Sequence, residues 1–469
     1  MWPMLLTAKV SSSKEVKNSE IFPTSAQLFF ISISVSSFSQ MSEKHSNNSS
    51  VNVPLVADHG ELAQHKTITY PPSAQDTVSL FHTCLNGLNA ISGVGILSVP
   101  YALASGGWLS LVLLFGIATA ALYTGTLIKR CMDMNTNIRS YPDIGELAFG
   151  KTGRIIVSVS MYTELYLVSM GFLILEGDNL SNLFPNAKVH IAGLAIAGKQ
   201  FFVILVSLII LPTVWLDSLS LLSYVSASGV FASLLIILSI TWTAIFDGVG
   251  FHHKGTLIHW NGLSTAISLY AFCYCAHPVF PTLYNSMTNK HHFTNVLIGC
   301  FLLTTVGYAS IAIVGYLMFG EEVESQVTLN LPLNKVSSKV AIYTTLMNPI
   351  SKFALMTTPI TNALKDLLPR SYKNKVTNIL VSTMLVMSTT IAALALPFFG
   401  SLMSLVGAFL SVTASIMLPC LCYLKISDTY RNFGCESIVI VILIMAALAM
   451  AISGTYTSFM EIAHHLVQL

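Results

Sequence analysis

Long apolar segments separated by short polar connections run from residue 79 to residue 458 of this chain. Each segment is long enough for a helix to cross the hydrocarbon core of a bilayer, which takes about 20 residues. A helix also satisfies its own backbone hydrogen bonds, as the bilayer interior requires. The pattern therefore predicts eleven membrane-spanning helices, over residues 79–105, 108–130, 155–175, 200–217, 219–246, 264–284, 294–318, 339–362, 376–396, 398–423 and 436–458.

The composition agrees with a membrane protein, because 53% of the 469 residues are hydrophobic and only 9% are charged. Soluble globular chains carry about 25% charged residues. The net charge of +2 gives no support to a nucleic-acid partner. The eight cysteines lie mostly in apolar segments, and we interpret them as small buried hydrophobic residues, with a metal or redox role as the alternative. The sequence predicts no bound metal and no cofactor.

The N-terminal region differs from the rest of the chain. Residues 1–77 are rich in Ser, Asn and Lys, and their one apolar run, residues 28–35, is too short to span a membrane. We expect a disordered cytosolic tail here, with Met41 as an alternative start. Residues 78–458 are predicted to form the transmembrane domain, and residues 459–469 a short non-cytosolic tail.

Basic residues are distributed unevenly between the two sides of the predicted helices. With the N-terminus in the cytosol, the inner connections hold twelve Lys and Arg residues and the outer connections hold five. Cytosolic loops carry the excess of basic residues in membrane proteins. We therefore expect a cytosolic N-terminus, which places the Asn179 glycosylation sequon on the outer side.

The first predicted span contains residues that interrupt helices. Its sequence NGLNAISGVGILSVPYALASGGW, residues 86–108, includes Gly93, Gly95 and Pro100. In a helix interior, glycine costs about 1 kcal/mol and proline about 3 kcal/mol relative to alanine. These residues lie within about two helical turns of each other. They predict a helix that is broken in the membrane.

The sixth span is interrupted in a similar way. Its sequence AFCYCAHPVFPTLY, residues 271–284, contains Pro278 and Pro281, and each proline removes one helical hydrogen bond. Two broken spans at matching positions of two halves are typical of transporters built from an inverted repeat, with the binding site at the breaks. Close helix packing is the alternative explanation for glycine and proline in membrane helices.

The chemistry of two such breaks suits a small zwitterion. Unwinding at Ser92–Gly95 frees backbone N–H groups at the positive end of a half-helix, which can hold a carboxylate. Carbonyls and side chains around Cys273–His277 can accept hydrogen bonds from an ammonium group. An amino acid carries both groups. The predicted substrate-binding residues are Asn89, Ser92, Gly93, Val94, Gly95, Tyr274, Cys275 and Ala276.

The two motifs, with FCYCAHPVFPTLYNSM as the second, resemble the amino acid/auxin permease superfamily. They are most similar to its plant and fungal vacuolar amino-acid transporter branch, which is related to the vesicular inhibitory amino-acid transporter. The resemblance covers residues 78–458. It implies an all-α membrane fold of eleven helices, with a five-plus-five inverted repeat, discontinuous helices 1 and 6 and one extra helix. It also implies proton-coupled movement of amino acids across the vacuolar membrane.

Two ionisable residues lie deep in predicted spans, where charges are costly and mark functional sites. Glu164 lies about 14 Å from the inner end of span three and Lys352 about 15 Å from the inner end of span eight, at 1.5 Å per residue. We expect the two side chains to pair or to share a polar network. Three alternatives remain: Lys352 carries the coupled proton, the pair is only structural, or the two residues do not meet.

Other polar residues near the breaks have less specific interpretations. His277 is a candidate proton site, because imidazole titrates near neutral pH, or a structural hydrogen-bond donor. Tyr162 and Tyr166 flank Glu164 and are expected to pack, with substrate contact as the alternative. Asn86 and Asn89 lie on the inner part of the first span and either contact substrate or bind neighbouring helices.

An enzyme is the competing class of function. The histidine pairs at 252–253, 291–292 and 464–465 lie on different sides of the predicted membrane and cannot share a metal ion. The chain contains neither a G-x-S-x-G nucleophile motif nor a phosphate-binding loop. A secondary transporter of amino acids and protons is therefore the predicted function, with a membrane sensor of amino acids as the alternative. The expected partners are the amino acid, the proton and the lipid bilayer.

Overall fold

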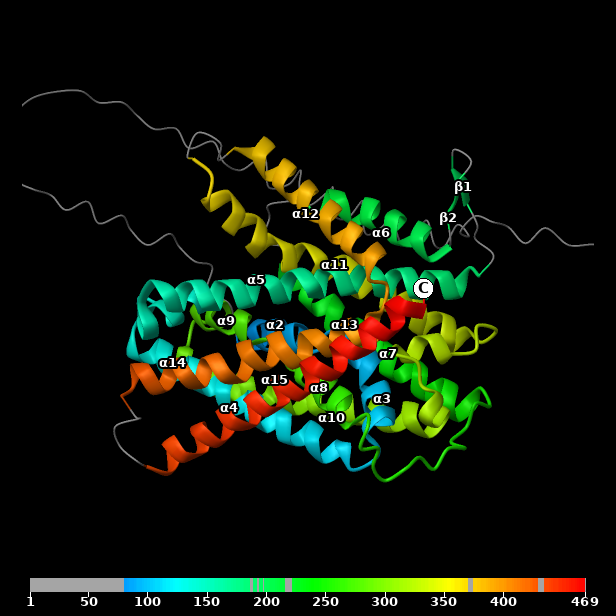
Figure 1. The fold of residues 1–469 in the computed structure, drawn as a ribbon, viewed down its shortest axis with the longest axis horizontal. Helices are drawn as coiled ribbons and strands as arrows, with labels where there is room; N and C mark the ends of the chain where they lie inside the picture. Colours follow the sequence, from blue (N-terminus) through cyan, green and yellow to red (C-terminus); the bar gives the residue numbers. More distant parts are fainter. Residues whose placement is uncertain are drawn as a thin grey trace, which may run out of the picture. The chain divides into compact units, whose positions relative to one another are not determined.

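The computed structural model of the chain describes residues 80–185, 189–191, 194–196, 198–215, 222–369, 374–428 and 434–468. The predicted tail over residues 1–77 lies outside the described residues. The described part is helical apart from one small antiparallel hairpin, in which β1 (Val189–Ile191) pairs with β2 (Leu194–Ile196) (Figure 1).

Helices occupy every predicted span. The first half contains α2 (Leu80–Ile91), α3 (Gly95–Gly106), α4 (Ser110–Met134), α5 (Tyr141–Leu183), α6 (Gly198–Val214) and α7 (Leu222–Phe246). The second half contains α8 (Leu263–Cys273), η2 (His277–Val279), α9 (Phe280–Ser286), α10 (Phe293–Phe319), α11 (Val336–Asp366), α12 (Lys375–Ala395), α13 (Phe399–Leu405) and α14 (Leu418–Ile426). Short turns η3 (Lys290–His292), η4 (Gly320–Glu322) and η5 (Val327–Asn330) flank α10, π-helical turns η7 (Val406–Ser411) and η8 (Thr413–Met417) join α13 to α14, and α15 (Cys435–Gln468) follows.

The helices differ in how clearly they qualify as membrane spans. By length and composition alone, eight described helical stretches can cross a membrane, or nine when the bent pair α2 and α3 counts as one span. The other two predicted spans correspond to α6, which is 17 residues long, and to α11, which is 31 residues long. Helix α11 carries Asn348 and Lys352 in its interior. These residues lower its hydropathy because they serve the site described below.

Both predicted breaks are present. Helices α2 and α3 meet at an angle of 47° across Ser92–Val94. Helix α8 ends at Cys273, and a non-helical stretch over 274–276 leads into η2 and α9. Pro100 is not part of the first break, because it lies inside α3. The glycine-rich stretch breaks the helix and the proline does not.

Two helices have boundaries that differ from those predicted from the sequence. Helix α5 begins at Tyr141, earlier than the predicted span 155–175, after a capping box formed by Ser140 and Asp143. The chain kinks at Phe149 and Gly150, where Gly150 has a φ of 65° that favours glycine. At the other end, α15 continues to Gln468, so most of the predicted tail over 459–469 is the end of this helix.

The helices form two packed groups within the described part of the chain. In the first group, which we call the bundle, α3 packs against α8 and α10, and α4 packs against α8, α9 and α10. In the second, which we call the scaffold, α5, α6, α11 and α12 pack against one another (Figure 1). Helix α7 packs against both α11 and α2. The two breaks belong to the bundle, and the scaffold lies against them.

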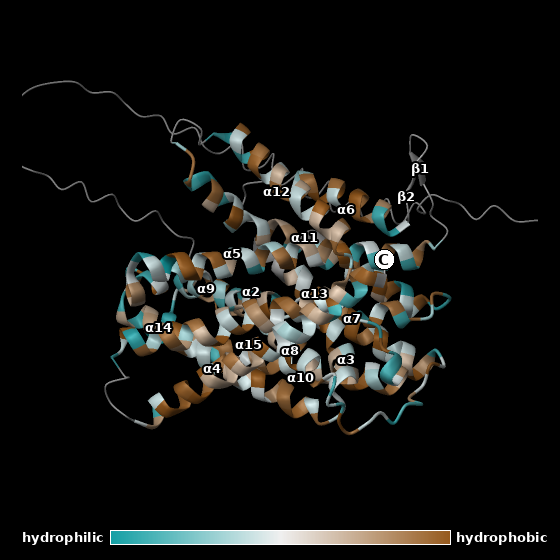
Figure 2. Cartoon of the chain, in the orientation of Figure 1, coloured by the Kyte–Doolittle hydropathy of each residue, from teal (hydrophilic) through white to brown (hydrophobic). Residues whose placement is uncertain are grey.

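Many residues along the helices are hydrophobic, which agrees with a lipid environment (Figure 2). Helix α12 exposes large apolar side chains at helical spacing: Val376, Leu380, Met384, Met387 and Ile391. A patch of this kind on a soluble protein would promote aggregation. In a bilayer it is the surface that contacts the acyl chains.

The connection between α7 and α8 is bound closely to the bundle. We call residues 248–262 the strap. Its backbone bonds to the ends of three bundle helices, through Trp108 N to Thr256 O at 3.1 Å, His259 N to Gly106 O at 3.1 Å and His253 N to Leu317 O at 3.2 Å. The strap therefore holds α3, α4 and α10 together at one end of the bundle.

Packing between α8 and η7 depends on a glycine. A Cβ atom at Gly407 would overlap the backbone oxygen of Ser268, whereas a Cβ atom at Gly116 of α4 would meet nothing within 4 Å. We expect Gly407→Ala to destabilise the protein by about 1–3 kcal/mol, because a backbone oxygen cannot move aside easily. We expect Gly116→Ala to leave stability unchanged or raised, because alanine favours a helix. Melting temperatures of the two purified variants in detergent test this; an equal melting temperature for both would contradict the packing described.

Candidate functional site

The first break offers backbone donors at the start of α3. The N–H of Gly93 donates to Ile91 O at 2.9 Å and to the Tyr308 hydroxyl at 3.3 Å. Among the described residues, no acceptor bonds with the N–H groups of Val94 or Gly95. The first N–H groups of a helix have no partner within it and favour negative charge. The geometry thus confirms the predicted local structure and leaves two donors available for an anion.

Lys352 is the cationic side chain at the first break. It extends from α11, is 2% exposed, and its Nζ donates to the carbonyl oxygen of Ser92 at 2.9 Å. This carbonyl lies in the unwound stretch, where its helical partner is lost. A scaffold helix of the second half therefore supplies a hydrogen bond that the broken helix of the first half lacks.

The second break is stabilised mainly within the bundle. The Tyr274 hydroxyl donates to Thr305 Oγ1 at 2.9 Å, and Ala276 N donates to Tyr274 O at 3.0 Å. His277 Nε2 lies 3.0 Å from Ala121 O and from Thr124 Oγ1. Because a carbonyl can only accept, Nε2 carries the hydrogen. This geometry favours the structural interpretation of His277 over a proton site.

Glu164 reaches the second break from the scaffold. It lies on α5, is 3% exposed, and accepts a hydrogen bond from Ser411 Oγ at 2.6 Å. The Cys275 side chain, at the second break, lies near the Glu164 carboxyl group. Ser411 belongs to π-helical turn η7, a rare conformation that often occurs at functional sites. Glu164 thus connects α5, the second break and η7.

Of the arrangements expected for Glu164 and Lys352, the structure does not show a direct ion pair. The Lys352 ammonium contacts Ser92 at the first break, and Glu164 contacts Ser411. The two residues lie at similar depths in their predicted spans, but depth does not determine the direction in which a side chain points around its helix. Each residue instead contacts the break of the opposite half.

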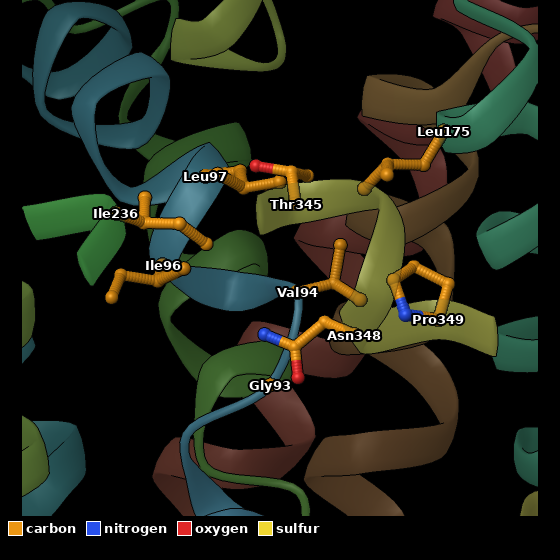
Figure 3. A pocket seen from close by; sticks show the side chains of 9 residues that line it. All are labelled: Gly93, Val94, Ile96, Leu97, Leu175, Ile236, Thr345, Asn348 and Pro349. Atoms are coloured by element: carbon orange, nitrogen blue, oxygen red, sulfur yellow. The ribbon is translucent and has the colours of Figure 1, made fainter. Parts of the chain in front are cut away.

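A small cavity lies beside the first break, between the bundle and the scaffold (Figure 3). Gly93, Val94, Ile96 and Leu97 line one side, and Leu175, Ile236, Thr345, Asn348 and Pro349 line the others. Its volume is about 10 Å³, which is space for about one water molecule. An amino acid is larger than this cavity.

Several predicted residues lie elsewhere. Tyr166 donates to Ser388 Oγ of α12 at 3.3 Å and faces that helix, which agrees with packing. Asn89 is buried, and its Oδ1 lies where a side chain on Gly229 of α7 would be, so it contacts a neighbouring helix. Tyr274 lies among bundle aromatics rather than at the cavity.

The sequence analysis missed two buried residues. Tyr308 on α10 contacts both breaks, but a tyrosine within an apolar span has the pattern of ordinary packing. Glu176 on α5 is 0% exposed, and neither of its carboxyl oxygens has a hydrogen-bond partner among the described residues. It directly follows the apolar run that ends at Leu175, so it fell just outside the predicted span 155–175.

The chain matches a known protein family over most of its length. The family is described as transmembrane amino acid transporter protein, and it covers residues 76–460. Amino acid transporter AVT1I of Arabidopsis thaliana is 57% identical over 385 residues, which are 82% of this chain and 95% of the relative. Amino acid transporter AVT1J of the same plant is 58% identical over 390 residues, which are 83% of this chain and 92% of that relative.

Solved structures agree on the fold. A Na⁺-coupled sialic acid symporter superposes with a TM-score of 0.50 at 13% identity, over 82% of this chain and 91% of the symporter. A nucleobase-cation-symport-1 family transporter superposes with a TM-score of 0.50 at 14% identity, over 83% and 92% of the two chains. These likenesses support an all-α inverted-repeat fold, in agreement with the two broken helices. The chain belongs to the transmembrane amino acid transporter family, a family of membrane transporters and not of enzymes.

Proposed function

We propose that this protein carries amino acids across a membrane by alternating access, and that proton movement drives the transport. The observation that carries this proposal is the hydrogen bond from the buried Lys352 ammonium to Ser92 O at the first break. It places a cationic side chain beside the two available N–H groups at the start of α3. Binding at this point is therefore linked to the protonation of a scaffold residue.

The backbone supplies the contacts for the substrate. The N–H groups of Val94 and Gly95 hold the carboxylate of the amino acid without a buried arginine. Gly95 lets the second break approach closely, since a Cβ atom there would lie 2.6 Å from Cys273 Sγ. Carbonyls of the unwound segments accept hydrogen bonds from the ammonium group.

Lys352 couples the proton to the conformational change. When protonated, it binds the first break of the bundle to helix α11 of the scaffold. Burial without a counter-charge favours the neutral amine, so release of the proton weakens this contact. The bundle is then free to move against the scaffold. The direction of amino-acid movement follows from the gradients on the two sides.

The cellular location rests on the resemblance to the vacuolar branch and on the distribution of basic residues. Twelve basic residues on the inner side against five on the outer side favour a cytosolic N-terminus. The proposed location is thus the vacuolar membrane, with the strap facing the lumen. A fluorescent protein fused to the N-terminus, together with protease protection in isolated vacuoles, tests both points.

Uptake into liposomes tests the transport function. We expect purified protein to accumulate at least one amino acid when a pH gradient is imposed in the absence of sodium, because the proton is the proposed driving ion. Liposomes without protein and liposomes without the gradient serve as controls. Amino-acid binding without flux under any gradient would favour the alternative of a membrane sensor.

Replacing Lys352 tests the coupling. We expect Lys352→Met to lose at least about tenfold in gradient-driven uptake, because it removes the charge-assisted hydrogen bond to Ser92 O. The matched control is Lys365→Met on the same helix, whose ammonium bonds to Asn378 Oδ1 at 2.9 Å, away from the break. Uptake by Lys352→Met with the wild-type rate and pH profile would refute the coupling role.

Glu176 is expected to stay protonated, because an isolated carboxylate without partners is too costly to bury. Glutamine has nearly the same shape as protonated glutamate, so we expect Glu176→Gln to keep uptake within about twofold and the melting temperature within about 2 °C. Glu164→Gln, which alters the contacts with Ser411 and Cys275, should reduce uptake more strongly. A shifted pH profile in Glu176→Gln would show that Glu176 exchanges a proton during transport.

A further inference from the structure

One hydroxyl group contacts both broken helices. The Tyr308 hydroxyl oxygen of α10 lies 2.8 Å from Ile91 O, 3.3 Å from Gly93 N and 3.4 Å from Cys273 O. Tyr308 is 1% exposed, so these contacts are buried. The first two contacts are at the first break and the third is at the end of α8, where the second break begins.

The contacts use both properties of a hydroxyl group. The oxygen accepts a hydrogen bond from the Gly93 N–H, as the carboxylate of a bound amino acid would. The hydrogen is donated to a backbone carbonyl, with Ile91 O at the shorter distance, as an ammonium group would donate. One neutral side chain therefore fills the hydrogen-bonding positions that suit the two ends of a zwitterion.

We propose that the Tyr308 hydroxyl is an internal substitute for the substrate, which occupies the first break in the empty transporter and is displaced when an amino acid binds. This inference rests on the proposed function, since it assumes that the substrate binds at the first break. It adds a side chain of the protein that competes with the substrate for the same hydrogen-bonding positions. It also gives the Ile91 carbonyl a hydroxyl donor at the break when no substrate is present.

The small volume of the cavity supports the proposal that the Tyr308 hydroxyl takes the place of the substrate. The cavity beside Gly93 and Val94 has a volume of about 10 Å³, so an amino acid cannot enter while the structure stays as it is. The Tyr308 ring packs edge-on against Tyr274, with the ring centres 5.7 Å apart. Tyr274 also lies at the second break. Movement of Tyr308 would thus be transmitted to that break.

A bound amino acid forms stronger hydrogen bonds at the first break than the Tyr308 hydroxyl does. Hydrogen bonds to an ionised group are about twice as strong as those between neutral groups. A carboxylate at the Gly93 N–H also gains from the N–H groups of Val94 and Gly95, which the hydroxyl does not use. The substrate therefore replaces weaker bonds with stronger ones.

The spacing restricts the class of substrate. A single oxygen atom bridges the Gly93 donor and the Ile91 acceptor, which are themselves 2.9 Å apart. The carboxylate and ammonium groups that replace it must be close together, as they are on one carbon atom. The site thus favours α-amino acids over γ-amino acids, whose charged groups are separated by three carbons.

Removing the hydroxyl tests the proposal. The dissociation constant of radiolabelled alanine is measured on purified wild-type and Tyr308→Phe protein, with γ-aminobutyrate as a competitor. Loss of the internal competitor should lower the dissociation constant three- to tenfold, because the empty state loses bonds that binding must otherwise break. The matched control is Tyr270→Phe, which removes another buried hydroxyl, bonded to Ser110 Oγ at 3.1 Å, and should leave the constant unchanged.

The outcomes separate the proposal from its alternatives. A dissociation constant that rises in Tyr308→Phe would show that the hydroxyl binds the substrate, and an unchanged constant would show a purely structural role; either result overturns the proposal. If Tyr308→Phe does not fold, 3-fluorotyrosine placed at position 308 gives the answer. Its ¹⁹F resonance should shift saturably with alanine, and an unchanged resonance under saturating alanine overturns the proposal. Failure of the wild-type protein to bind or transport any amino acid would instead refute the proposed function.

Discussion

Backbone groups that lose their helical partners inside a bilayer must find new ones, and this requirement governs the centre of the structure. Helix α3 begins only three residues after α2 ends, and α8 stops at Cys273 with further helix following. Each interruption exposes donors and acceptors where water is scarce. Tyr308 and Lys352 each bond to a backbone carbonyl of the first break, and His277, at the second break, bonds to Ala121 O of the unbroken helix α4. The polar residues in the membrane are therefore explained by the breaks that they stabilise.

Lys352 and Glu164 each lie near the broken helix of the other half of the chain. Lys352 of the second half bonds to the break of the first half, and Glu164 of the first half contacts the break of the second. Both residues lie on scaffold helices, and both breaks lie in the bundle. Inverted halves place equivalent helices in equivalent positions, so such an exchange is natural for this fold. The hydrogen bonds of Lys352 and Glu164 consequently make part of the boundary between bundle and scaffold sensitive to charge.

Much of this arrangement could be predicted from the sequence, because its causes are local. Glycine at 93 and 95 and proline at 278 disfavour a regular helix in their own neighbourhood, and both breaks were predicted correctly. The contacts of Glu164 and Lys352 could not be predicted, since matching depth leaves the orientation around each helix open. Glu176 was missed because the apolar run ends one residue before it, although α5 continues to Leu183. Tyr308 could not be distinguished from a packing residue, because its significance depends on two segments far away in the sequence.

The strap over residues 248–262 has a consequence for how motion in this protein could be observed. Its backbone is bonded to the ends of α3, α4 and α10, so it must travel with these helices and not as a loose loop. Leu257, in the middle of the strap, is 70% exposed. A spectroscopic label or a small antibody fragment attached there would report the position of the whole rigid body. A label on the strap would thus report any movement of the bundle from an accessible surface.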